Sequence, residues 1–168
     1  MGERLSATED LGGRAGERDM LGGFLDWYRV VVEHKVQGLS LEDATRSMTP
    51  SGLSPLGVVA HLASVEIGWF VETVAGEPVD PIWDDHGSFR LLPGDTVESV
   101  LAEYRDACAR SRAIADATPS LDSLSAAADR YRGNVSLRWV LMHMIEETAR
   151  HAGHLDLMRE QIDGQLGD

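Results

Sequence analysis

The chain has 168 residues, of which 43% are hydrophobic, and a formal net charge of −13. This length suits one domain with a buried core. The negative charge argues against binding to nucleic acid or anionic membranes, which are polyanions, and favours small molecules or proteins as partners. A single cysteine excludes an intrachain disulfide, and the N-terminal stretch lacks the apolar run of a signal peptide. We therefore expect a cytoplasmic protein.

The first part of the chain divides into a tail and a helix. Residues 1–18 are rich in glycine and charge, so we expect a flexible tail, followed by a single domain over residues 19–168. From Asp19 onward, mostly apolar side chains recur at spacings of three and four residues. This pattern predicts one helix that ends near Gly38. The face that this spacing defines consists of Leu21, Phe24, Leu25, Tyr28, Val31, Val32 and Lys35.

A second helix is predicted from Pro55 to about Val74. Ser54 can cap its first turn, and proline is favoured at the first helical position. Residues 76–94 show neither helical nor strand periodicity and are expected to form a long loop, a kind of segment that often serves a site. No apolar stretch is expected to reach the roughly 20 residues that span a bilayer, so we expect a soluble chain.

The third predicted helix begins at Thr96. Asp95 is expected to act as an acidic N-cap, with Glu98 three residues later completing a capping box. The helix should end near Thr118, because the proline that follows cannot continue it. Its expected buried face is Val97, Leu101, Tyr104, Cys108, Ser111 and Ala115.

The fourth predicted helix runs from the start signal at residues 133–136 to a stop at residues 162–164. With no strand pattern elsewhere, these four helices predict an all-α fold. The simplest architecture is a four-helix bundle, either up-and-down or with a crossover connection.

Ionisable residues occupy the middle of one face of this fourth helix. At 100° per residue, His143, His151 and His154 all lie within about 40° of Glu147. Apolar residues share the direction, so the face should point into the bundle. These apolar residues are Val140, Met144, Leu155 and Met158.

Such a face predicts a metal site. Burying a carboxylate and imidazoles costs several kcal/mol unless charge and hydrogen bonds compensate, and a metal ion compensates well. Glu147 and His151 are four residues apart, so their side chains can converge on one ion. His61 is the histidine on the apolar face of the second helix and is the candidate third ligand. Nitrogen and oxygen ligands without cysteine suit Zn²⁺, Ni²⁺, Fe²⁺ or Mn²⁺.

Each of these residues also has a simpler interpretation. Charged helices produce Glu/His pairs by chance, and a lone core histidine is commonly just hydrogen-bonded. His154 and His143 are each either hydrogen-bonded core residues or groups that support the ligands or shuttle protons. Cys108 is expected to be a buried hydrophobe rather than a nucleophile. The aromatic residues that either line a pocket or pack in the core are Trp69, Trp83 and Trp139.

Residues 137–156 and 56–66 resemble the signature of the DinB-like superfamily, in particular its branch grouped with mycothiol-dependent enzymes. The resemblance covers about residues 19–163. It implies a four-helix bundle whose metal is held by a histidine of the second helix and two residues of the fourth. In relatives similar to mycothiol-dependent maleylpyruvate isomerase, the first of those two is glutamate. Carried to this chain, the implied ligands are His61, Glu147 and His151, with Zn²⁺ favoured.

The function implied by the resemblance is metal-dependent transfer of a low-molecular-weight thiol such as mycothiol, with the metal stabilising the thiolate. The expected partners are this thiol and an electrophile, without nucleic acid or membrane; a homodimer is left open. One alternative is a hydrolase that uses a metal-bound water, with His154 or His143 handling the proton. Another is a non-catalytic, metal-binding, stress-related protein.

Overall fold

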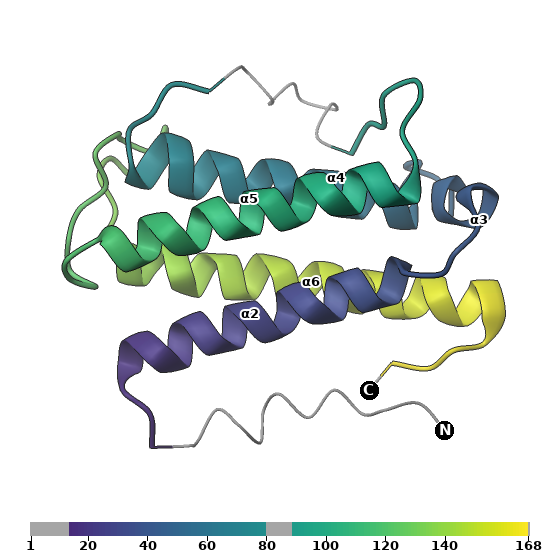
Figure 1. Cartoon of the computed structure of the whole chain (residues 1–168), viewed down its shortest axis with the longest axis horizontal. Helices are drawn as coiled ribbons and strands as arrows, with labels where there is room; N and C mark the ends of the chain where they lie inside the picture. The colour runs from purple at the N-terminus through teal and green to yellow at the C-terminus, as the bar shows by residue number, and fades with distance from the viewer. Residues whose placement is uncertain (1–13, 80–88, 168) are drawn as a thin grey trace.

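The protein forms a bundle of helices (Figure 1). The structure is a computed structural model that describes residues 14–79 and 89–167. Within those residues no strand is formed, which confirms the all-α expectation. The helices are α2 (Glu17–Val36), α3 (Leu41–Thr45), α4 (Pro55–Glu66), its π-helical continuation η1 (Ile67–Val74), α5 (Val97–Ala117) and α6 (Leu137–Asp163).

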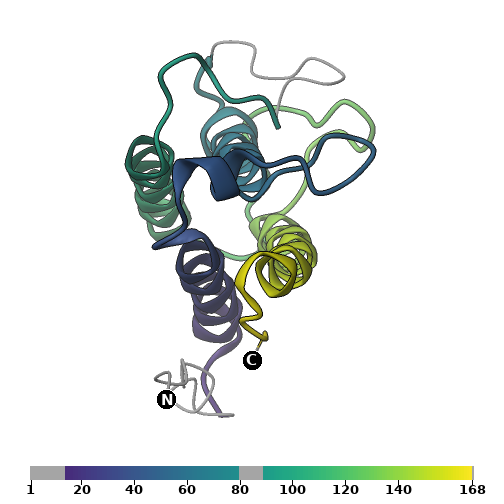
Figure 2. The ribbon, with the colours of Figure 1, turned by 90° about the vertical axis from the view of Figure 1, so that its right-hand side faces the viewer.

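The bundle is of the crossover type. Helices α2 and α6 run parallel: Glu17 pairs with Arg138 near their N-terminal ends, and Lys35 pairs with Asp156 farther along. Helices α4 and α5 also pack together and run in one direction, opposite to the first pair (Figures 1 and 2). Because α4 and α5 are parallel, η1 finishes at one end of the bundle and α5 begins at the other.

The starts of α4, α5 and α6 follow the sequence signals with one correction. The hydroxyls of Ser54 and Ser136 accept hydrogen bonds from the backbone amides of Gly57 and Trp139, as capping residues do. At α5, however, the N-cap is Thr96, which forms a reciprocal capping box with Ser99. The expected cap, Asp95, instead accepts a hydrogen bond from the amide of Leu92, so it stabilises the preceding turn.

The N-terminal boundary lies earlier than expected. Helix α2 starts at Glu17, two residues before the expected Asp19. The Arg18 guanidinium donates to the carbonyl oxygens of Ala115 and Thr118, and this contact ties the first turn to the end of α5. Residues 17 and 18 therefore belong to the bundle. The rest of the predicted tail in residues 1–13, and Trp83 in the long loop, lie outside the described residues.

Two local features are absent from the sequence expectation. The short helix α3 follows α2 and is capped by Ser40. The second long helix changes from α to π geometry at Ile67, where the Ala75 amide donates to the carbonyl of Phe70, five residues back. The Thr73 side-chain hydroxyl also donates to the carbonyl of Gly68. A π-helical segment is uncommon and frequently marks a functional site.

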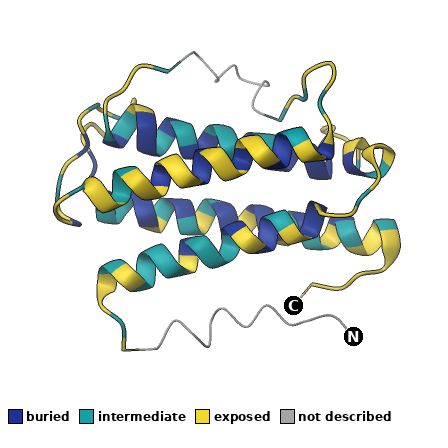
Figure 3. Ribbon diagram, viewed as in Figure 1, coloured by how far each residue is buried: buried dark blue, intermediate teal, exposed yellow. Residues whose placement is uncertain are grey.

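The core lies where the apolar faces of the long helices meet (Figure 3). The predicted inward faces of α5 and α6 are confirmed, apart from the half-buried Ala115. Segment Pro55–Val74 is 20 residues long with mean hydropathy 1.2, which is long and apolar enough to cross a membrane. The expectation that no stretch reaches that length is therefore wrong. Since 61% of its apolar window is buried in the bundle, this length is weak evidence for a membrane span.

One buried ion pair crosses this core. The Arg29 guanidinium on α2 donates two hydrogen bonds to the Glu66 carboxylate at 2.7 and 2.6 Å. The side chains are only 5% and 1% exposed. Burial opposes the charge on Arg29, but the attraction and hydrogen bonds of Glu66 outweigh it and raise the pKa of the guanidinium. The pair fixes the last residue of α4 against α2, just before the π-helix begins.

Candidate metal centre

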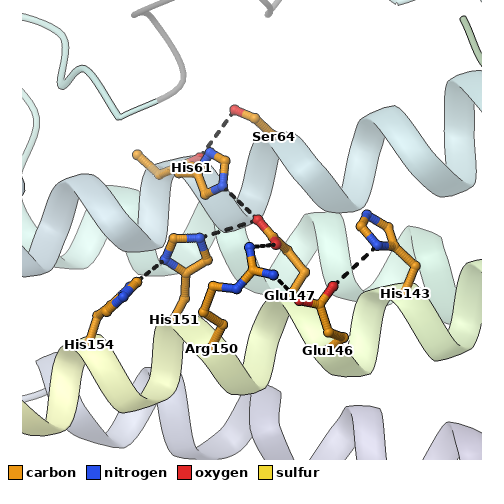
Figure 4. A network of polar contacts seen from close by, with 9 residues as sticks. His61, Ser64, His143, Glu146, Glu147, Arg150, His151 and His154 are labelled. Atoms are coloured by element: carbon orange, nitrogen blue, oxygen red, sulfur yellow. Dashed lines mark hydrogen bonds and ion pairs between the residues drawn. The ribbon is translucent and has the colours of Figure 1, made fainter. Parts of the chain in front are cut away.

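Three ionisable side chains converge between the antiparallel helices α4 and α6 (Figure 4). His61 projects from α4, and Glu147 and His151 project from adjacent turns of α6. Nε2 of each histidine lies 3.2 Å from the same oxygen, Oε1 of Glu147. One possible ligand atom from each residue lies within 4.8 Å of the others. The structure thus brings together the three residues that the sequence predicted as ligands.

The cluster is partly closed to solvent and favours a charged carboxylate. The His61 and His151 side chains are 9% and 7% exposed, and that of Glu147 is 14% exposed. Hydrogen bonds from His151 and then His61 hold the pKa of Glu147 far below its usual value, against the opposing effect of burial. Glu147 is therefore ionised throughout the neutral range and is available to a cation.

An aromatic ring that the sequence did not suggest covers one side of His61. Phe89 stacks on the His61 imidazole with ring centroids 3.9 Å apart and planes 13° from parallel. Gly57 permits this approach, because a Cβ at that position would lie 2.7 Å from the Phe89 carbonyl oxygen. The one related feature of the sequence is Gly57, in the first turn of the second helix. A glycine there does not indicate that the Phe89 ring packs on His61.

Two further histidines were predicted on the same face of α6, and they differ in position. Nδ1 of His154 lies 3.3 Å from Nδ1 of His151, on the side of that ring away from Glu147. Burial, followed by the nearby His151, lowers the pKa of His154. His143 instead packs between Trp69 and Trp139, with ring centroids 4.8 and 5.0 Å away, and burial lowers its pKa as well. The structure therefore adds His154 to the cluster but not His143.

Cys108 takes no part in the cluster. It is buried on α5, and its Sγ lies 3.8 Å from Oε1 of Glu66. Burial, together with the Glu66 carboxylate, raises the pKa of the thiol to about 12. The thiolate is the reactive form of cysteine, so this environment agrees with the structural interpretation of Cys108.

The glycine near the ligands on α6 does not mediate close helix packing. Gly153 is exposed, and a Cβ added there would meet no atom within 4 Å. Gly57 has the tight environment instead. Close backbone approach at the candidate centre therefore occurs at the start of α4.

The helical bundle and the His/Glu/His cluster between α4 and α6 define a protein of the DinB-like superfamily. Within it, the family model of mycothiol-S-transferase matches residues 20–164. The chain belongs to this family, as the sequence resemblance indicated. A search among curated proteins found no match.

Proposed function

We propose that this mycothiol-related transferase joins the sulfur of mycothiol to an electrophile at a divalent cation held by His61, Glu147 and His151. The observation that carries the proposal is the convergence of two imidazole nitrogens on one carboxylate oxygen, with family membership naming the thiol. These donors come from two helices that the core already holds in place. The site can therefore be preformed, as a binding site for a substrate requires.

The donor set fits a cation of the Zn²⁺, Ni²⁺, Fe²⁺ or Mn²⁺ kind, with Zn²⁺ favoured. It offers two neutral nitrogen donors and one carboxylate, with no thiolate, and three protein ligands are typical of catalytic rather than structural sites. When bound, the cation supplies a net positive charge that favours the thiolate form of an incoming thiol.

The residues around the ligands orient them. For His151 to offer the lone pair of Nε2, its ring proton must lie on Nδ1, where it can be donated to Nδ1 of His154. His154 therefore positions His151 and selects its tautomer. Phe89 covers the flat side of His61 and shields that part of the site from water.

The reaction forms one bond from sulfur to carbon. The thiol loses its proton to solvent or a base, and the sulfur electron pair attacks the electrophilic carbon of the cosubstrate. In the loaded protein Glu147 would be committed to the cation, so it is not the group that takes up that proton. The chain thus contributes binding and orientation. If the electrophilic carbon carries a leaving group, the bond to that group breaks and the group departs with the electron pair. If the carbon belongs to an activated double bond, the π electrons move to the neighbouring atom, which then takes up a proton.

Cobalt substitution tests the proposal. The protein is loaded with Co²⁺ and titrated with mycothiol, and we expect charge-transfer absorption that is missing with a desthiol analogue. His61→Ala should abolish the response, whereas His34→Ala should retain it, because His34 is an exposed histidine on α2. If the spectrum stays silent at millimolar thiol while the protein hydrolyses esters or amides in a His61-dependent manner, the hydrolase hypothesis replaces this proposal.

A further inference from the structure

A second feature of the molecule is a cavity of about 690 Å³ at the end of the bundle where η1 meets the segment before α6. Its volume is within the range of small-molecule sites. Trp69 is the large apolar side chain of its lining. The polar lining comes from η1 and from the turn that follows residue 128, and consists of Glu72, Thr73, Asp129, Arg130 and Tyr131.

An aromatic contact connects the lining of this cavity to the helical turn that precedes Glu147. His143 lies one helical turn before Glu147 on α6, and its ring contacts Trp69 edge-on at 4.8 Å. On the opposite helix, Gly68 also lines the cavity and lies seven residues after His61, so both occupy nearly the same helix face. The rise from His61 to Trp69 is about 12 Å at α-helical spacing. The cavity lining therefore lies about two helical turns from His61, and its Trp69 contacts the residue one turn from Glu147.

The wall of the cavity is fixed by backbone hydrogen bonds. The amides of Ala126 and Ala127 donate to the carbonyls of Val74 and Thr73 at 3.0 and 3.1 Å. The Asp129 carboxylate accepts hydrogen bonds from the backbone amides of Tyr131 and Arg132, which holds the turn. These contacts join the turn to the π-helix, so the cavity does not depend on a ligand for its shape.

The lining chemistry suits an uncharged, polyhydroxylated ligand. A sugar ring presents an apolar C–H face that can lie on an indole, and hydroxyl edges that bond to carboxylates and guanidinium groups. Asp129 is paired with Arg132 at 3.3 Å, and Glu72 and Arg130 offset each other formally. The cavity therefore has no strong net charge to select an ionic ligand.

We propose that this cavity binds the sugar portion of the thiol, with Trp69 as its stacking platform and Arg130 as a hydrogen-bond donor. The inference rests on the proposed function, which places the sulfur at His61, Glu147 and His151. In mycothiol, a short amide linkage separates the cysteine from a glucosamine–inositol unit, so a sulfur held at the metal centre places that unit one to two helical turns away. Trp69 and His143 lie at that separation.

The test compares two thiols on the Co²⁺-loaded protein by calorimetry and by absorption. Mycothiol carries the sugar, and N-acetylcysteine lacks it. We expect Trp69→Leu to raise the dissociation constant of mycothiol about tenfold, and Arg130→Ala about threefold. Neither substitution should change the dissociation constant of N-acetylcysteine by more than about twofold.

Arg110→Ala is the matched control. Arg110 is also an exposed arginine that lines a cavity, but that cavity lies between α4 and α5. Arg130 is exposed, so its substitution leaves the core intact even if Trp69→Leu disturbs folding. One outcome overturns the sugar site and leaves the proposed function standing. In it, the unmodified protein gives the charge-transfer band, but Arg130→Ala and folded Trp69→Leu bind mycothiol with the same affinity as Arg110→Ala. If neither thiol gives the band in the unmodified protein, both proposals are overturned.

Discussion

The buried pair of Arg29 and Glu66 provides the sharpest test of how the bundle is stabilised. In Arg29→Met, a flexible apolar side chain of similar length replaces the guanidinium and leaves the Glu66 carboxylate, 1% exposed, without its two charge-assisted hydrogen bonds. The Cys108 thiol also lies 3.8 Å from this carboxylate, but a thiol is a weak donor. Breaking such a pair from one side costs about 3–5 kcal/mol in the free energy of unfolding.

That loss corresponds to a fall in melting temperature of about 6–20 °C for a chain of this size. Urea denaturation followed by circular dichroism measures the free energy directly. Arg112→Met is the matched control, because Arg112 is 43% exposed and pairs with the surface residue Asp26; its cost should be about 0.5 kcal/mol or less. The double variant Arg29→Met/Glu66→Leu removes both charges and should recover most of the loss.

The two variants separate a buried charge from a simple packing defect. If Arg29→Met costs less than about 1 kcal/mol, or no more than Arg112→Met, the reasoning is refuted. If the double variant is as unstable as the single one, the loss comes from packing around Arg29 rather than from an unpaired carboxylate.

Three further predictions concern the candidate centre and the thiol. His61→Ala should lower metal content to near background with unchanged helical circular dichroism, because the apolar helix faces exist without the ion; unchanged metal stoichiometry contradicts the ligand set. Gly57→Ala should destabilise the protein and weaken metal retention, because the new Cβ collides with the Phe89 carbonyl. Gly153→Ala, by contrast, should stabilise α6 by about 1 kcal/mol. Equal changes in the free energy of unfolding of the two variants in urea titrations would contradict this difference. Since the pKa of Cys108 is raised to about 12, the thiolate is scarce below that pH, and iodoacetamide should label the folded protein at pH 8 only on addition of denaturant.

Much of the fold was predictable from periodicity and capping. The apolar repeats predicted the four long helices. Serine residues in the N-cap position marked the starts of two of them, α4 and α6. The relation between Glu147 and His151 was also predictable, because helical spacing alone fixes which side chains share a face. His61 required one more step, namely that a histidine among apolar neighbours on a buried helix faces the same core.

The remaining features depend on tertiary contacts that local patterns do not encode. Phe89 lies in a segment without periodicity, so its stacking on His61 follows from the path of the chain over Gly57. The π-helix depends on hydrogen bonds five residues apart, and propensity does not distinguish them from α-helical ones. The burial of Arg29, unlike these features, can be inferred from the local pattern. Arg29 is four residues after Leu25 and three before Val32, so it lies on the buried face of its helix. A buried arginine there indicates a buried partner.

The separation of the three candidate ligands along the chain determines when the candidate centre can form during synthesis. His61 and Glu147 are 86 positions apart, and α6 follows the other helices of the described residues along the chain. Helices α2 to α5 can begin to associate while translation continues, but they hold just one of the three side chains. The full set exists only after His151 has left the ribosome and α6 has docked. A nascent chain or a C-terminally truncated product therefore cannot sequester an ion through this cluster, and under the proposed function loading with metal would follow the completion of the bundle.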